Sequence, residues 1–206
     1  LLFSLLGYTS SGTPFVDHHS TFFCLLAVYS FLFAIKNEKN IFWISIPIFL
    51  GFAFLSKQVP AFYIFLILSI IIIIYLFTLN KIDPLKSILL GIILFIFFLI
   101  LLIFFGGIKF ESFINQYILY PQSIGNDRFS NFKPTFDGIV SHFKFIYISI
   151  APFFFINLKL IISKKKFFKK KNFFYFITIL LFTLSLIFHQ FFTKNQTYIF
   201  FLIPLL

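Results

Sequence analysis

A carboxylate and two imidazoles follow one another at Asp17, His18 and His19, between the turn-forming segment 12–14 and a long apolar run. Charged groups beside hydrocarbon are costly, so such a cluster is a candidate functional site by default. Carboxylate and imidazole groups suit a divalent cation, and we expect Asp17 with His18 to be the metal-binding pair. Adjacent side chains on a helix point about 100° apart, so at most two of the three share one ion. The alternative is a helix cap, in which Asp17 binds free N–H groups of the first turn.

Three further polar residues lie in or between the predicted membrane spans and can bind a phosphate oxygen, namely Lys57, Arg128 and His189. Arg128 is the only arginine in the chain, and its planar guanidinium can grip phosphate with two hydrogen bonds. Simpler interpretations stay open. Lys57 can extend to water, Arg128 can pair with the adjacent Asp127, and His189 can titrate near neutral pH.

The composition excludes an ordinary soluble domain. Of the 206 residues, 60% are hydrophobic, 24% are aromatic and only 11% are charged. Soluble proteins carry about 25% charged residues, so this chain has far too few to cover a water-exposed surface. We therefore expect a polytopic membrane protein.

Apolar runs of membrane-spanning length predict an all-α fold, a transmembrane helix bundle with about six to eight spans. Four runs reach the necessary length, namely 59–79, 87–105, 139–162 and 173–192. Two shorter runs, 21–35 and 41–55, are long enough only if their polar flanks continue the helix. Partial runs at 1–6 and 198–206 predict that the chain is a fragment, with N- and C-terminal parts missing.

The lysines predict the orientation of the bundle. If successive loops alternate between the two sides, one side receives eleven lysines and the other receives six basic residues. An excess of Lys and Arg in short loops marks the cytoplasmic face. All four histidines then lie on the extracytoplasmic face, and the formal net charge of +11 reflects topology rather than nucleic-acid binding.

Residues 106–138 are predicted to form an extracytoplasmic loop that contains an interfacial helix. The segment is too long for a simple connection in a helix bundle, which takes about 2 to 8 residues. One face of its first half is apolar, with Phe110, Phe113, Ile114, Tyr117 and Ile118. Such a helix suits the membrane interface, although a loop packed on its own bundle is the alternative. No linker marks a second domain, so residues 1–206 are expected to form a single integral membrane domain.

The order of these polar elements resembles the membrane glycosyltransferases of the GT-C superfamily. Within that superfamily it is most similar to the protein mannosyltransferases and aminoarabinose transferases. The resemblance rests on segments 12–23, 51–58 and 189–204, which cover a minor part of the chain. Residues Asp17-His18-His19 also resemble the Asp-His-His element of archaeal oligosaccharyltransferases.

The resemblance implies a GT-C-like bundle in a bacterial inner membrane, with its active site at the extracytoplasmic face. The enzyme would transfer a hexose or pentose from a polyprenyl-phosphate donor to a lipid, glycan or protein acceptor. By this resemblance four phosphate candidates would hold the donor, namely Lys57, Arg128, His189 and Lys194. Asp17 with His18 or His19 would orient the sugar or the acceptor, or bind a divalent metal ion as the only cofactor. The family's catalytic acid lies in the first outer loop, so the general base is expected upstream of Leu1 and the fragment alone is expected to be inactive.

Three other functions stay open. An O-antigen polymerase or ligase also uses extracytoplasmic basic residues, but commonly several arginines, and this chain has one. A transporter or flippase tends to carry polar residues and broken helices at mid-membrane, whereas the predicted spans are almost purely apolar. A non-catalytic scaffold subunit would tolerate Asp17→Asn and Lys57→Ala.

Overall fold

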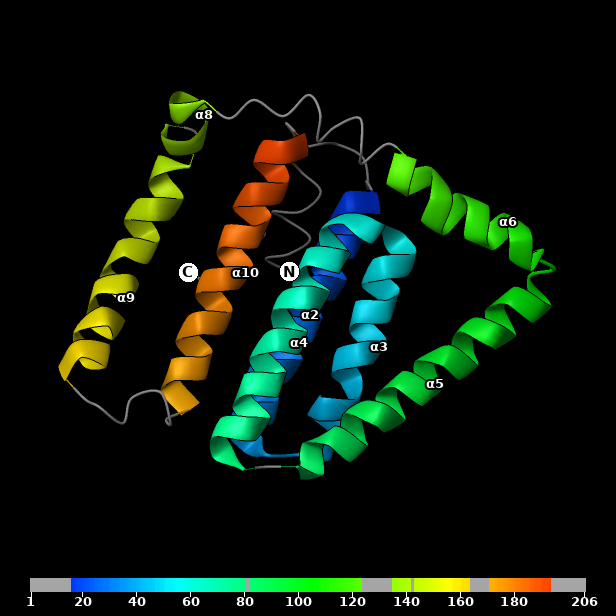
Figure 1. The fold of residues 1–206 in the computed structure, drawn as a ribbon, viewed down its shortest axis with the longest axis horizontal. Coiled ribbons are helices and arrows are strands. Elements are labelled where there is room, and N and C mark those ends of the chain that lie inside the picture. Colours follow the sequence, from blue (N-terminus) through cyan, green and yellow to red (C-terminus); the bar gives the residue numbers. More distant parts are fainter. Residues whose placement is uncertain (1–15, 81, 124–134, 142, 164–170, 194–206) are drawn as a thin grey trace, which may run out of the picture.

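The fold is built from helices that run up and down between two ends of a bundle (Figure 1). The structure, a computed structural model, describes residues 16–80, 82–123, 135–141, 143–163 and 171–193, and within them it contains no strand. The helical elements in chain order are α2 (Val16–Asn37), α3 (Asn40–Ser56), α4 (Gln58–Leu79), α5 (Asp83–Phe105), α6 (Phe110–Ile114), η1 (Asn115–Leu119), α8 (Phe136–Val140), α9 (Lys144–Ser163) and α10 (Lys171–Thr193).

The predicted all-helical membrane class is confirmed in this coarse form. Among the described residues, α2, α4, α5 and α10 are long and apolar enough to cross a membrane. The run 21–35 does extend into its polar flanks, because α2 has 22 residues, whereas α3 has only 17. The partial runs at 1–6 and 198–206 lie outside the described residues. The count of six to eight spans and the GT-C arrangement therefore stay predictions.

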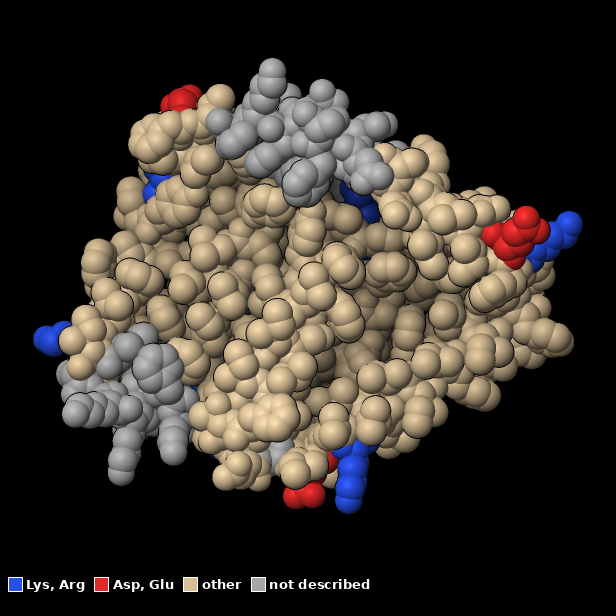
Figure 2. Space-filling view, in the orientation of Figure 1, with Lys and Arg blue, Asp and Glu red and all other residues tan. Residues whose placement is uncertain are grey.

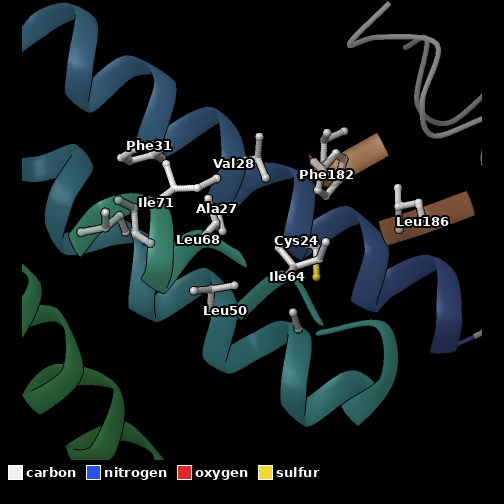
Figure 3. Close-up of a cluster of buried hydrophobic side chains, with 14 of the residues drawn as sticks. Cys24, Ala27, Val28, Phe31, Leu50, Ile64, Leu68, Ile71, Phe182 and Leu186 are labelled. Atoms are coloured by element: carbon white, nitrogen blue, oxygen red, sulfur yellow. The ribbon is translucent and has the colours of Figure 1, made fainter. Parts of the chain in front are cut away.

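The core lies where α2 packs on α3, α4 and α10. Figure 3 shows part of it, with Cys24 and Val28 of α2, Ile64 of α4, and Phe182 and Leu186 of α10 in one buried cluster. Close-packed apolar side chains of this kind hold helices together in water and in lipid alike. This core fixes the relative positions of α2, α4 and α10, which carry most of the candidate site.

Two ends of the bundle are distinguished by their polar residues. We call one the histidine end; it holds the first turn of α2, the α3–α4 junction at Lys57 and the last turns of α10 (Figure 1). The opposite lysine end holds the α2–α3 and α4–α5 connections and the first turn of α10, where Lys171 pairs with Glu38. In Figure 2 the Lys, Arg, Asp and Glu side chains lie mainly near the margins of a largely uncharged face, as expected for a membrane bundle.

Helix α5 crosses α3 closely and then leaves the bundle toward α6 (Figure 1). A Cβ atom at Gly91 would overlap the carbonyl oxygen of Ile44 and lie 2.6 Å from Cγ of Pro47. Small residues allow helix backbones to approach in this way inside membranes. Farther along, large apolar residues are exposed, including Phe97 at 59% and Phe104 at 77%. Hydrocarbon is the solvent that suits such a surface.

Helices α6 and η1 lie within the predicted loop 106–138, where the apolar periodicity indicated a helix. The rings of Phe113 and Tyr117 stack with their centroids 4.9 Å apart, on the face predicted to be apolar. The extracytoplasmic location of the loop, the interfacial position of its helix and the single-domain organisation of residues 1–206 stay predictions.

Candidate functional site

The Asp-His-His segment lies in the first turn of α2, where its two imidazoles have different environments. His18 is buried, with 2% of its surface exposed, whereas His19 is exposed. Consecutive side chains of a helix diverge, so this difference follows from the local geometry. The side chain of Asp17 lies outside the described part of the structure. A carboxylate in a first turn is favoured by the helix dipole whether or not it has a further role.

A metal site at this segment stays a prediction. Among the side chains that the structure describes, no group of three or more His, Cys, Asp and Glu residues is placed to hold an ion. The expected pair, Asp17 with His18, is not tested by this result because the carboxylate of Asp17 is not described. Imidazole and carboxylate remain a suitable donor set for a divalent cation.

Lys57 lies in the one-residue junction between α3 and α4, at the histidine end. Its backbone is extended, with φ −160° and ψ 132°, and its N–H donates to the carbonyl of Ala53 at 3.0 Å. Its carbonyl accepts a hydrogen bond from Oγ of Ser20 at 3.0 Å. Since Ser20 is fully buried in α2, this bond ties the α3–α4 junction to the first turns of α2.

Replacing Ser20 by alanine is expected to lower the free energy of unfolding by about 1 kcal/mol, because a part-buried carbonyl loses its hydrogen-bond donor. Thermal unfolding in detergent would measure the loss. Ser56→Ala is the matched control, since the hydroxyl of Ser56 donates only to the Phe52 carbonyl of its own helix. Equal melting temperatures for wild type and Ser20→Ala would show that the bond to Lys57 does not hold the junction.

His189 lies in the last turns of α10 and is fully buried. Its ring contacts Tyr63 of α4, with the ring centroids 6.1 Å apart and the planes at 62°. Tyr63 also contacts Phe188, at 5.7 Å between centroids. These contacts hold the imidazole of His189 against α4. Tyr63, the residue of α4 that it contacts, follows Lys57 by only a few residues along the chain.

Of the phosphate candidates, the structure describes two. Lys57 and His189 both lie at the histidine end, together with His18 and His19. Arg128 and Lys194 lie outside the described residues, so the structure does not test their predicted proximity.

Sequence reasoning missed three polar residues at this end. Ser20 bonds to the Lys57 carbonyl, Tyr63 contacts His189, and Gln190 is buried with 2% exposure. The long-range contacts of Ser20 and Tyr63 leave no signal in the local sequence pattern. Gln190 did leave a signal, because an amide inside an apolar run of membrane-spanning length is costly unless it has a partner.

The arrangement offers a half-buried cation, two buried imidazoles and an aromatic ring at one end of an apolar bundle. Such groups can bind an anion that enters from the membrane boundary, since cations and imidazole both donate to phosphate oxygens. Comparisons of the chain with protein families, with curated proteins and with solved structures found no match. The resemblance to the GT-C superfamily therefore rests on the chain's own segments.

Proposed function

We propose that this protein is a membrane glycosyltransferase whose donor is a sugar linked to a polyprenyl phosphate. The acceptor is a lipid, a glycan or a protein, and the active site lies at the extracytoplasmic face of a bacterial inner membrane. The histidine end supports this proposal most. There His18, Lys57 and His189 come from three parts of the chain to one end of an apolar bundle, where a lipid-linked anion would arrive.

In the proposed reaction the acceptor hydroxyl attacks the anomeric carbon from the side opposite the phosphate. A carboxylate takes the hydroxyl proton while the bond between the anomeric carbon and the phosphate oxygen breaks, so polyprenyl phosphate leaves with the bonding electrons. The phosphate candidates stabilise the negative charge on the leaving group.

The first turn of α2 has a different role in this proposal. Asp17 with His18 or His19 orients the sugar or the acceptor, or holds a divalent ion that does so. Either role fits a buried imidazole beside an exposed one, because one side chain can face the bundle while the other faces the incoming acceptor.

A transporter or flippase is the main alternative from another functional class, and the buried polar residues of the spans bear on it. Among these residues are Asn157, Thr183 and Ser185. Each donates a hydrogen bond to a carbonyl of its own helix, at 2.8 to 2.9 Å. Polar groups that are satisfied within one helix do not need to line a substrate path, so these three contacts give no support to a transporter.

Asp17→Asn and Arg128→Lys are each expected to reduce sugar transfer by about tenfold or more in the full-length protein. Asp17→Asn removes a negative charge, and Arg128→Lys removes the bidentate contact that a guanidinium makes with phosphate. Transfer from labelled polyprenyl-phosphate sugars in membrane vesicles would measure the effect. Lys86→Arg, a conservative change of an exposed lysine at the opposite end, is the control. Wild-type transfer rates in both site variants, with normal membrane insertion, would refute the site assignment.

A further inference from the structure

Gln190 and Thr178 differ in their hydrogen bonding from two other buried polar side chains of α10, Thr183 and Ser185. Only 2% of the surface of Gln190 is exposed, and its amide nitrogen, Nε2, has no hydrogen-bond partner among the residues that the structure describes. Thr183 and Ser185, by contrast, bond to carbonyls of their own helix. A buried hydrogen-bond donor without an acceptor destabilises a protein. The buried amide of Gln190 therefore indicates a role that offsets this cost.

The position of Gln190 places it among the residues of the candidate site. Leu186 of α10 and Cys24 of α2 belong to one buried cluster (Figure 3). Gln190 follows Leu186 by one turn on the same helix face, and Ser20 precedes Cys24 by one turn. Because α2 begins and α10 ends at the histidine end, both steps lead toward it. Ser20 in turn bonds to Lys57.

The chemistry of the amide indicates the kind of group that it binds. An amide N–H is a neutral donor, and a phosphate buried against it without a cation would keep most of its desolvation cost. The half-buried Lys57 is better suited to the phosphate. A hydroxyl oxygen is neutral and can accept the amide hydrogen bond while it donates elsewhere. Tyr63 nearby adds an aromatic ring, held against His189.

We propose that Gln190 recognises the transferred sugar, with its side-chain amide donating a hydrogen bond to a hydroxyl of the sugar ring. This inference rests on the proposed function, because it assigns the sugar part of the same donor. The amide nitrogen has no acceptor among the described residues and gains one when the donor enters. Sites built to bond a hydroxyl discriminate strongly against ligands that lack it, so Gln190 is a specificity-determining residue.

Gln190→Met tests this role, because methionine keeps the length of the side chain and removes the amide. The full-length protein would be titrated with undecaprenyl-phosphate mannose, glucose and aminoarabinose, and with undecaprenyl phosphate alone. We expect the Kd of the sugar lipid that wild type prefers to rise about tenfold, which is the effect of one neutral hydrogen bond. The Kd of undecaprenyl phosphate should not change. The melting temperature without lipid should equal or exceed that of wild type, since an unpartnered buried amide is removed.

Thr178→Val is the matched control. Thr178 is fully buried on the same helix, and its hydroxyl also has no partner among the described residues, but it lies three turns away from Gln190 toward the lysine end. Thr178→Val should leave the Kd of the preferred sugar lipid and the Kd of undecaprenyl phosphate at their wild-type values.

The outcomes separate the two proposals. Wild-type protein that binds none of the four lipids would overturn the proposed function. Wild-type protein that binds all four lipids equally, or a Gln190→Met protein that keeps the sugar-lipid affinity of wild type, would overturn the role of Gln190 alone. A Gln190→Met protein that melts below wild type would show a structural role for the amide and would also overturn this inference.

Discussion

Lys57→Ala is expected to reduce sugar transfer about a hundredfold, the effect typical of removing one group that stabilises charge in a transition state. The side chain projects from a junction whose backbone is fixed on both sides, by the N–H bond to Ala53 and by the bond from Ser20. The junction thus keeps the origin of this side chain at the histidine end, where in our proposal its ammonium group stabilises the charge of the leaving phosphate. The measurement is the initial rate of transfer from a labelled polyprenyl-phosphate sugar.

Lys86→Ala provides the control for this substitution, because Lys86 is exposed in the first turns of α5, at the lysine end. It should transfer sugar at the wild-type rate. The two backbone bonds at Lys57 do not involve its side chain, so Lys57→Ala should also keep the wild-type melting temperature. A transfer rate within twofold or so of wild type in Lys57→Ala would remove this residue from the site.

Gly91→Leu is expected to lower the stability of the bundle by about 3 kcal/mol or more, at the upper end of the range for overpacking. The first atom of any side chain at Gly91 would overlap the carbonyl oxygen of Ile44, and backbone cannot move aside as a flexible side chain can. Helices α3 and α5 would have to separate. Thermal unfolding and the yield of monodisperse protein in detergent would measure the effect.

Leu94→Phe is the control, because it also enlarges a side chain of α5, at a position that is 45% exposed to the surroundings of the bundle. It should melt close to wild type, because no neighbouring backbone lies in its way. If Gly91→Leu also melts at the wild-type temperature, α3 and α5 do not cross as closely as the structure shows.

The bodies of most helices could be predicted because spans are set by local composition, although the run 139–162 is observed as two separate helices, α8 and α9. The run 59–79 predicted helix α4, observed as Gln58–Leu79, and the run 87–105 predicted the body of α5, observed as Asp83–Phe105. The apolar run of α5 began after its first turn, where Asp83 and Lys86 interrupt the pattern. Helix ends are less certain because polar residues in a first turn can belong to helix or loop.

The contacts between helices could not be predicted, because they depend on packing rather than on sequence neighbours. Gly91 looks the same in the sequence whether it faces lipid or the Ile44 carbonyl. The sequence also indicated that His18 and His19 diverge but could not indicate which one is buried. That depends on the side of α2 that packs on the rest of the bundle.

The candidate site could be predicted only in part, because its residues can be recognised in the sequence but their contacts cannot. Polar residues in apolar surroundings, such as His189 and Lys57, can be recognised in the sequence because their burial is costly. The predicted alternation of the loops also placed both at one end of the bundle. Gln190 could be seen in the sequence too, but its significance comes from the burial of its amide without a partner among the described residues, which only three-dimensional packing reveals.

The central claim is tested most directly by sugar transfer from a polyprenyl-phosphate donor. The protein would be reconstituted in vesicles with labelled undecaprenyl-phosphate mannose, glucose or aminoarabinose. An envelope extract would supply the acceptors. Our account predicts that one of these sugars is transferred by wild type and that Lys57→Ala abolishes nearly all of the transfer. Correctly inserted wild-type protein that neither transfers any of the three sugars nor binds their lipid carriers would contradict it.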